Sequence, residues 1–184
     1  MTEGLFQTST NYSLQKLQVM LSSIDQKSLS KFLGLLREAN RVFVYGSGRS
    51  GLVGRAFAIR LAHLGIQSYV IGETICAPVK KNDLVIIISG SGKTMPSVMT
   101  AEIAKDIGAH IVIITTKEGQ SFSKKADAAL IIDVQQDEKR GKLAPLGSLF
   151  ESASWLLFDG IISELMEQIG ETEHSMRKRH ATLQ

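Results

Sequence analysis

At 184 residues the chain is long enough to bury one core and too short for two ordinary domains, so one domain over residues 1–184 is expected. Its 43% hydrophobic and 21% charged residues exclude a disordered chain or a disulfide scaffold. The net charge of +3 comes from scattered basic residues, which favours small anionic ligands and argues against nucleic acid as a partner.

The chain begins with a polar segment, residues 1–11, which we interpret as a flexible N-terminus. It lacks the basic flank and apolar core of a signal peptide, and no later apolar run approaches the ~20 residues of a membrane span. A cytoplasmic protein with no membrane partner is therefore expected. Apolar residues at helical spacing, such as Leu14, Leu17 and Leu33, predict helices over residues 12–24 and 26–39.

Strands and helices alternate through the middle of the chain. Short apolar strands are predicted at residues 41–45, 68–71, 84–88, 111–114 and 130–132, and helices at 50–63, 96–107 and 121–125. Residues 84–88 (L-V-I-I-I) are apolar on both faces, as a parallel strand covered by helices must be. The pattern predicts an α/β fold: a doubly wound, five-stranded parallel sheet of flavodoxin-like order 2-1-3-4-5, flanked by helices.

The last third of the chain is expected to contain three further segments. Residues 135–146 are polar and charged, which predicts a mobile surface loop. A long C-terminal helix is predicted over residues 148–168, and residues 171–184 form a charged tail.

Two glycine- and serine-rich loops, residues 46–51 and 89–94, each lie between a strand and a helix. Glycine lets the backbone approach a ligand, and the free N–H groups of a helix start attract anions. Thr94 is placed as an N-cap, and Pro96 suits the first helical turn. The residues predicted to bind a phosphate group are Ser47, Gly48, Arg49, Ser50, Ser89, Ser91, Gly92, Lys93 and Thr94.

The predicted strand order brings both loops to one crevice, between the carboxyl ends of the first and third strands. Either loop alone is as well explained as a tight turn, but two matched loops at this point favour a phosphate site. The first loop also fits a dinucleotide motif through Gly46, Gly48 and Gly51, with Glu73 as the ribose-binding acid. The dinucleotide interpretation assigns no function to the second loop, residues 89–94. A nucleoside-triphosphate loop is excluded because Ile87 stands where glycine is needed.

These loops resemble the sugar isomerase (SIS) domain family, whose mark after the third strand is S-x-S-G-x-T, here residues 89–94. A narrower resemblance, to the 6-phospho-3-hexuloisomerases, rests on residues 46–65, I-G-E-T at 71–74, P-L-G-S-L-F-E at 145–151 and R-H-A-T-L-Q at 179–184. Lys93, where an acid is common, and Ser47, where alanine is common, depart from that pattern.

The resemblance implies interconversion of D-arabino-hex-3-ulose 6-phosphate and fructose 6-phosphate through an enediol, with no metal or organic cofactor. It implies Glu151 as the catalytic base and His180 as a catalytic group that enters a neighbouring subunit of a homotetramer. From position alone, Glu151 is better explained by the helix dipole or by a capping box with Ser148. Glu73 is expected to reach the edge of the crevice and contact substrate.

Two other functions remain open at this stage. SIS domains also form sugar-phosphate sensing modules in regulators, which bind the same ligands without a catalytic base. An NAD(P)-dependent oxidoreductase is the third alternative. Cys76, the single cysteine, cannot form an internal disulfide, and no Cys and His residues stand at zinc-ligand spacing.

Overall fold

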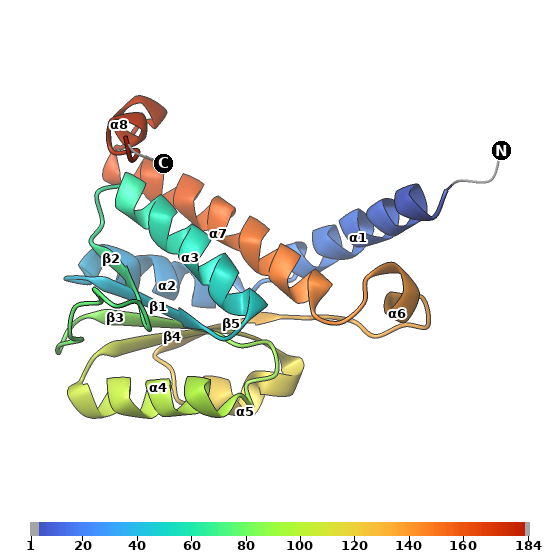
Figure 1. Cartoon of the computed structure of the whole chain (residues 1–184), viewed down its shortest axis with the longest axis horizontal. Helices are drawn as coiled ribbons and strands as arrows, with labels where there is room; N and C mark the ends of the chain where they lie inside the picture. The colour runs from blue at the N-terminus through green and yellow to red at the C-terminus, as the bar shows by residue number, and fades with distance from the viewer. Residues whose placement is uncertain (1–3, 183–184) are drawn as a thin grey trace.

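The five predicted strands form one parallel sheet in the computed structural model, which describes residues 4–182 (Figure 1). The strands are β1 (Val42–Gly46), β2 (Ser68–Val70), β3 (Leu84–Ile88), β4 (His110–Thr116) and β5 (Ala128–Ile132). The helices are α1 (Leu5–Ser22), α2 (Gln26–Glu38), α3 (Arg49–His63), α4 (Met95–Ile107), η1 (Lys117–Gly119), α5 (Gln120–Ser123), α6 (Arg140–Leu143), α7 (Ser148–Ile169) and α8 (Glu173–Lys178).

The strand order is β2-β1-β3-β4-β5, which confirms the predicted doubly wound topology. β1 pairs with β2 through Val42 and Ser68, and with β3 through Val42 and Leu84. The strand that follows β1 in the chain, β2, is added on one side of β1, and β3 to β5 are added on the other side. The order of strands therefore reverses between β1 and β3, although all strands stay parallel. In such sheets the helices on the two sides of this point leave on opposite faces, and a crevice opens at the carboxyl ends.

Helices cover both faces of the sheet, as Figure 1 shows. Helices α2, α3 and α7 pack on one face, and α4 and α5 pack on the other. Alternate residues of β3 divide between these layers: Ile86 faces the first, and Val85 and Ile87 face the second. This two-sided burial explains why the segment is apolar without interruption.

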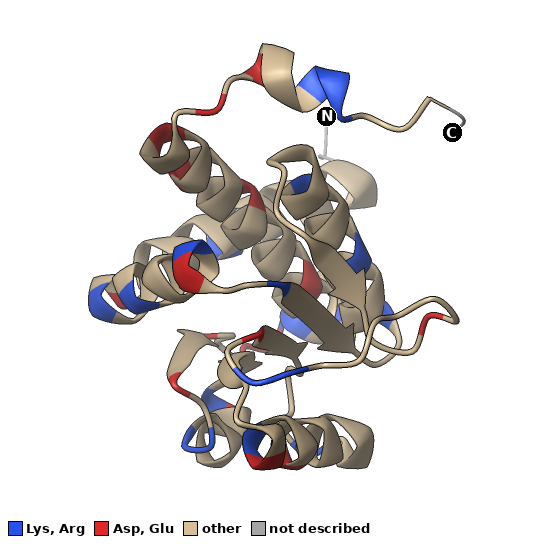
Figure 2. Ribbon diagram, turned by 90° about the vertical axis from the view of Figure 1, so that its left-hand side faces the viewer, with Lys and Arg blue, Asp and Glu red and all other residues tan. Residues whose placement is uncertain are grey.

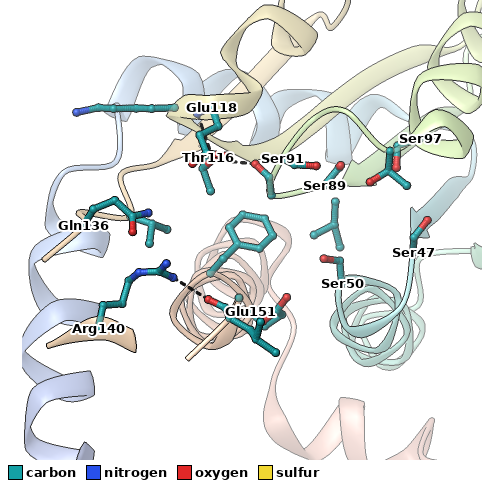
Figure 3. A pocket seen from close by; sticks show the side chains of 18 residues that line it. Ser47, Ser50, Ser89, Ser91, Ser97, Thr116, Glu118, Gln136, Arg140 and Glu151 are labelled. Atoms are coloured by element: carbon teal, nitrogen blue, oxygen red, sulfur yellow. Dashed lines mark hydrogen bonds between the residues drawn. The ribbon is translucent and has the colours of Figure 1, made fainter. Parts of the chain in front are cut away.

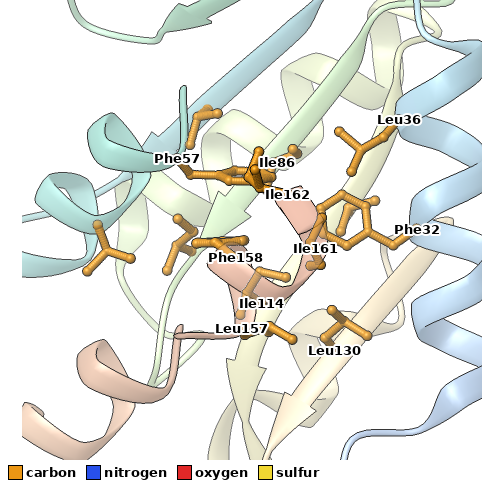
Figure 4. Close-up of a cluster of buried hydrophobic side chains, with 14 of the residues drawn as sticks. Phe32, Leu36, Phe57, Ile86, Ile114, Leu130, Leu157, Phe158, Ile161 and Ile162 are labelled. Atoms are coloured by element: carbon orange, nitrogen blue, oxygen red, sulfur yellow. The ribbon is translucent and has the colours of Figure 1, made fainter. Parts of the chain in front are cut away.

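The larger core joins α2, α3 and α7 to the sheet (Figure 4). Its centre is a stack of Phe57 on Phe158, with ring centroids 4.1 Å apart. Phe32 and Ile162 pack in the same cluster. Fully burying a side chain of this size stabilises the fold by about 1.5–3 kcal/mol, so this cluster fixes α3 and α7, the helices that begin at the site described below.

Three segments differ from the prediction. Helix α1 begins at Leu5, not at residue 12, so residues 5–11 are helical; Ser9 Oγ donates to the Leu143 carbonyl oxygen at 2.6 Å. The loop at 135–146 contains α6, and the tail contains α8, which Thr172 caps. Residues 1–3 of the predicted flexible N-terminus and residues 183–184 of the predicted charged tail lie outside the described residues.

Charged side chains are spread over the molecule without a face of one sign in the view of Figure 2, which agrees with their scattered positions in the sequence. Within residues 4–182, no helix combines the length and apolar character that crossing a bilayer requires.

Candidate active site

The first glycine-rich loop turns sharply from β1 into α3. A Cβ atom on Gly46 would lie 2.7 Å from the Gly51 backbone nitrogen, so the two glycines allow a close contact that no other residue permits. Gly48 has a φ of 57°, in the left-handed region. The turn presents Ser47 and Ser50 to a cavity at the carboxyl end of the sheet.

The second loop follows β3 and is held by the end of β4. Thr115 Oγ1 donates to the Ser89 carbonyl oxygen at 2.6 Å, and Thr116 Oγ1 donates to the Gly90 carbonyl oxygen at 2.7 Å. Within the loop, the Ser89 N–H donates to the Ile114 carbonyl oxygen and the Gly92 N–H to the Ser89 carbonyl oxygen, so these bonds fix the course of the loop between β3 and α4. Gly92 has a φ of 61° and packs against Gly119, which adds a second constraint.

Helix α4 points its N-terminus into the same cavity. Thr94 is the N-cap residue, as predicted, but its side chain makes no capping hydrogen bond. Ser97, one turn into the helix, is fully buried and lines the cavity, and its Oγ has no hydrogen-bond partner within the described chain. A buried hydroxyl without a partner is costly, so the Ser97 hydroxyl fits a bound oxyanion at the positive end of the helix.

Both loops line one cavity of about 510 Å³, which confirms that they meet at the crevice between β1 and β3 (Figure 3). The lining residues are Ser47, Ser50, Ile88, Ser89, Gly90, Ser91, Thr94, Ser97, Thr116, Lys117, Glu118, Val134, Gln136, Arg140, Leu146, Gly147, Phe150 and Glu151.

Glu151 stands in the first turn of α7 at the floor of this cavity. Burial raises the pKa of its carboxyl group, and the positive charge of Arg49 partly opposes that rise. Arg49 Nη2 lies 3.2 Å from Oε2, yet Oε2 is buried and accepts no hydrogen bond from the described residues. The carboxylate also lies against Gly147, where a Cβ atom would come within 2.7 Å of Oε1. An under-solvated carboxylate of this kind has the character of a general base.

The structural alternative for Glu151, a capping box with Ser148, is not formed. Gly147 is the N-cap of α7 and makes no side-chain cap, and Ser148 Oγ has no hydrogen-bond partner in the part of the chain that is described. The capping box with Ser148 is therefore absent, and Glu151 keeps only the favourable position of an acidic residue in the first turn of a helix.

The other predicted site residues separate into two groups. Gly48, Arg49, Gly92 and Lys93 belong to the two loops but do not form the cavity wall. Glu73 was expected at the crevice edge, and this is corrected: it forms an ion pair with Arg55 and does not line the cavity. The reason is that β2 lies on the outer side of β1, one strand away from the crevice.

His180 lies far from the cavity of its own chain. Its ring stacks on His63 at 5.0 Å, at the C-terminal end of α3, whereas the site is at the N-terminal end. A helix of that length spans about 20 Å. Burial lowers the pKa of His63, and the charges of His180 and Arg60 lower it further. A role of His180 in a neighbouring subunit's site stays a prediction.

Several lining residues were not predicted from the sequence. Thr116 ends β4 and Lys117 and Glu118 follow it, so the rule that ligands bind at the carboxyl ends of parallel strands could have found them. Gln136 and Arg140 come from the segment expected to be a mobile loop, and no sequence motif marks them. Within residues 4–182, no group of three or more His, Cys, Asp or Glu side chains is arranged to hold a metal ion.

Comparison with known proteins identifies the family. Residues 35–152 match the model of the SIS domain. The chain belongs to the SIS domain family.

Relatives of this SIS domain protein include two 3-hexulose-6-phosphate isomerases. That of Methanocaldococcus jannaschii is 36% identical over 158 residues, covering 86% of this chain and 85% of its own. That of Bacillus subtilis is 34% identical over 177 residues, covering 93% and 95%. A protein of Methanococcus jannaschii, whose crystal structure led to the inference of the same function, superposes with a TM-score of 0.82 at 32% identity, covering 96% of this chain and 97% of its own.

Proposed function

We propose that this SIS domain protein is a sugar-phosphate isomerase that interconverts D-arabino-hex-3-ulose 6-phosphate and fructose 6-phosphate. Two features that meet in one cavity carry the proposal. The first is the set of serine and threonine hydroxyls from the two loops, here called the phosphate seat, among which no metal-ligand group is found within residues 4–182. The second is the Glu151 carboxylate, whose Oε2 atom is buried. The named relatives, aligned over most of both chains, support the choice of substrate.

The phosphate seat consists of uncharged donors. The side chains of Ser47, Ser50, Ser89, Ser91 and Thr94 line the cavity, and α4 begins beside it at Met95. Figure 3 shows the four serines. Hydroxyls can each donate to a phosphoryl oxygen, and a helix N-terminus adds a favourable dipole. A phosphate held there places the sugar carbons over Glu151.

Glu151 then acts as the base. Its carboxylate takes the proton from C2 of the 3-hexulose, the C–H electron pair becomes the C2–C3 double bond, and the carbonyl electrons move to the oxygen on C3. The hydroxyl proton on O2 passes to O3, and the proton on Glu151 returns to C3 as the carbonyl forms at C2. His180 of a neighbouring subunit is the group proposed to carry the hydroxyl proton.

The test is the Glu151→Gln variant, which keeps the shape of the side chain and removes the base. We expect kcat for fructose 6-phosphate formation to fall by about 100- to 10,000-fold, while fructose 6-phosphate still raises the melting temperature. Glu118→Gln, which changes another carboxylate in the cavity wall, is the matched control. Retained turnover in Glu151→Gln would refute the assignment of the base.

Ligand-induced stabilisation separates the proposed function from the oxidoreductase alternative. A ligand that binds the native state raises its melting temperature, so fructose 6-phosphate should stabilise the wild-type protein and NAD(P) should not. Stabilisation by NAD(P) alone would favour the dinucleotide interpretation of residues 46–51.

A further inference from the structure

Arg140 reaches into the cavity from the side opposite the phosphate seat. It begins α6, in the segment between β5 and α7, and its side chain extends toward Glu151 across from Ser47 and Ser50 (Figure 3). Its Nη1 donates to the Leu146 carbonyl oxygen at 2.8 Å. A guanidinium group has five N–H donors, so most of its donors remain for a ligand.

Of the two cations that line the cavity, Lys117 and Arg140, only Arg140 has no ion pair with a described residue. Lys117 Nζ lies 2.6 Å from Asp133, and Arg49 is paired with Glu151. Among the residues that the structure describes, no carboxylate pairs with Arg140. An unpaired, half-buried guanidinium beside a cavity is stabilised by any negative charge that develops within it.

The backbone at Arg140 is fixed by contacts with α1. Asp137 Oδ1 accepts a hydrogen bond from the Arg140 backbone N–H at 3.0 Å, and the same carboxylate accepts from the Tyr12 hydroxyl at 2.9 Å. Lys16 Nζ lies 2.6 Å from Asp137. At the other end of the segment, Leu146 holds a φ of 56°, which is strained for a leucine, and its carbonyl accepts from Arg140.

We propose that Arg140 is a catalytic residue whose guanidinium binds the oxygens on C2 and C3 of the sugar and stabilises the enediolate. The inference rests on the proposed function, and it assigns the charge-stabilising group that the reaction requires. When Glu151 removes the C2 proton, the carbonyl electrons move to oxygen, and the negative charge faces Arg140. Donors that are fixed before the reaction, as Arg140 is by Asp137 and Leu146, stabilise such a charge most effectively.

The experiment compares Arg140→Gln and Arg140→Lys with Lys142→Gln, which removes one positive charge from the same short helix outside the cavity. We expect Arg140→Gln to lower kcat by about 100- to 1,000-fold. Arg140→Lys should fall between this variant and the wild type, because a lysine offers a point charge without the planar fork of donors. Lys142→Gln should change kcat by less than about twofold.

Inorganic phosphate serves as a probe of the phosphate seat, and thermal unfolding reports its binding. All three variants should be stabilised by phosphate like the wild type, because Arg140 lies across the cavity from the seat. Loss of both turnover and phosphate stabilisation in Arg140→Gln would show a structural role and overturn the inference. If Arg140→Gln does not fold, the Arg140→Lys variant provides the test. A folded Arg140→Lys variant with the kcat of the wild type would overturn the inference.

The two proposals fail in different ways. An inactive wild-type enzyme would overturn the proposed function and this inference with it. An active wild type with an equally active Arg140→Gln variant would overturn the role of Arg140 alone.

Discussion

The Glu151 carboxylate is subject to two opposing influences. Burial raises its pKa by disfavouring the charged form, and the nearby Arg49 guanidinium lowers it. A base must be deprotonated to act, so kcat/KM is expected to fall as the pH drops through this pKa. The carboxylate lies against Gly147, where a Cβ atom would come within 2.7 Å of Oε1, so a larger residue at position 147 would displace the carboxylate.

Replacing Arg49 with methionine should move the acidic limb of the kcat/KM profile to higher pH. Without the positive charge, the pKa of Glu151 rises, and a higher pH is needed to deprotonate it. Because Arg49 is half-exposed, the shift should stay below about one pH unit. Arg60→Met, on the same helix, is the control. A raised KM with an unmoved acidic limb would place Arg49 on the phosphate and contradict the prediction.

At the scale of elements, α1 and the segment 135–146 depend on each other. The segment crosses from β5 to α7 and supplies Gln136 and Arg140 to the cavity, yet it contains only the four-residue helix α6. Tyr12 and Lys16 of α1 hold it through Asp137. Lys16 and Tyr12 lower the pKa of Asp137 to about 2, against its ordinary 3.8.

Asp137→Asn should weaken the contact between α1 and the segment 135–146. It should also remove the contribution of Asp137 to the pH dependence of the free energy of unfolding. A carboxyl group whose pKa is lower in the folded than in the unfolded chain stabilises the fold above its unfolded pKa, and that contribution is lost as the pH falls. The wild-type free energy of unfolding should therefore fall more steeply than that of the variant between about pH 4 and pH 2. Denaturant titrations at each pH measure this. Glu138→Gln, at a carboxylate without an ion pair among residues 4–182, is the control, and parallel curves for Asp137→Asn and wild type would contradict the prediction.

On the whole molecule, two apolar surfaces lie on opposite sides of the sheet. Helix α4 exposes Met95, Met99, Ile103 and Ile107 along one stripe. The groove between α3 and α7 exposes Ile59, Trp155 and Leu156. Exposed apolar surface of this extent is typical of interfaces between subunits. It supports the predicted homo-oligomer.

Trp155→Glu should reduce the oligomer to a smaller species, because a charge in a buried interface is left without a partner. Light scattering coupled to size-exclusion chromatography measures the mass. Ser30→Glu places the same charge on α2, which exposes no large apolar side chain, and should leave the mass unchanged. An unchanged mass for Trp155→Glu would exclude the α3–α7 groove from the interface.

The order of strands and helices could be predicted because the apolar residues of each strand reflect how that strand is buried in the sheet. Residues 84–88 are apolar on both faces, and only a central parallel strand needs that. The two glycine- and serine-rich loops follow β1 and β3 directly, so the topology alone brings them together. The ends of the chain were predicted less well: residues 5–11 are helical because α1 packs along a segment more than a hundred residues away.

The amino-acid sequence by itself determined the parallel sheet and the meeting of the two glycine- and serine-rich loops, because local pattern and strand order place both. Glu151 as the candidate base came from the family resemblance, since its position alone favours a helix-dipole or capping role. Only the tertiary structure decided that Glu73 pairs with Arg55, that Ser97 faces the cavity and that Arg140 crosses it. A side chain from an irregular segment is positioned by distant contacts, here Asp137 with Tyr12 and Lys16, and such contacts leave no periodic signal in the sequence.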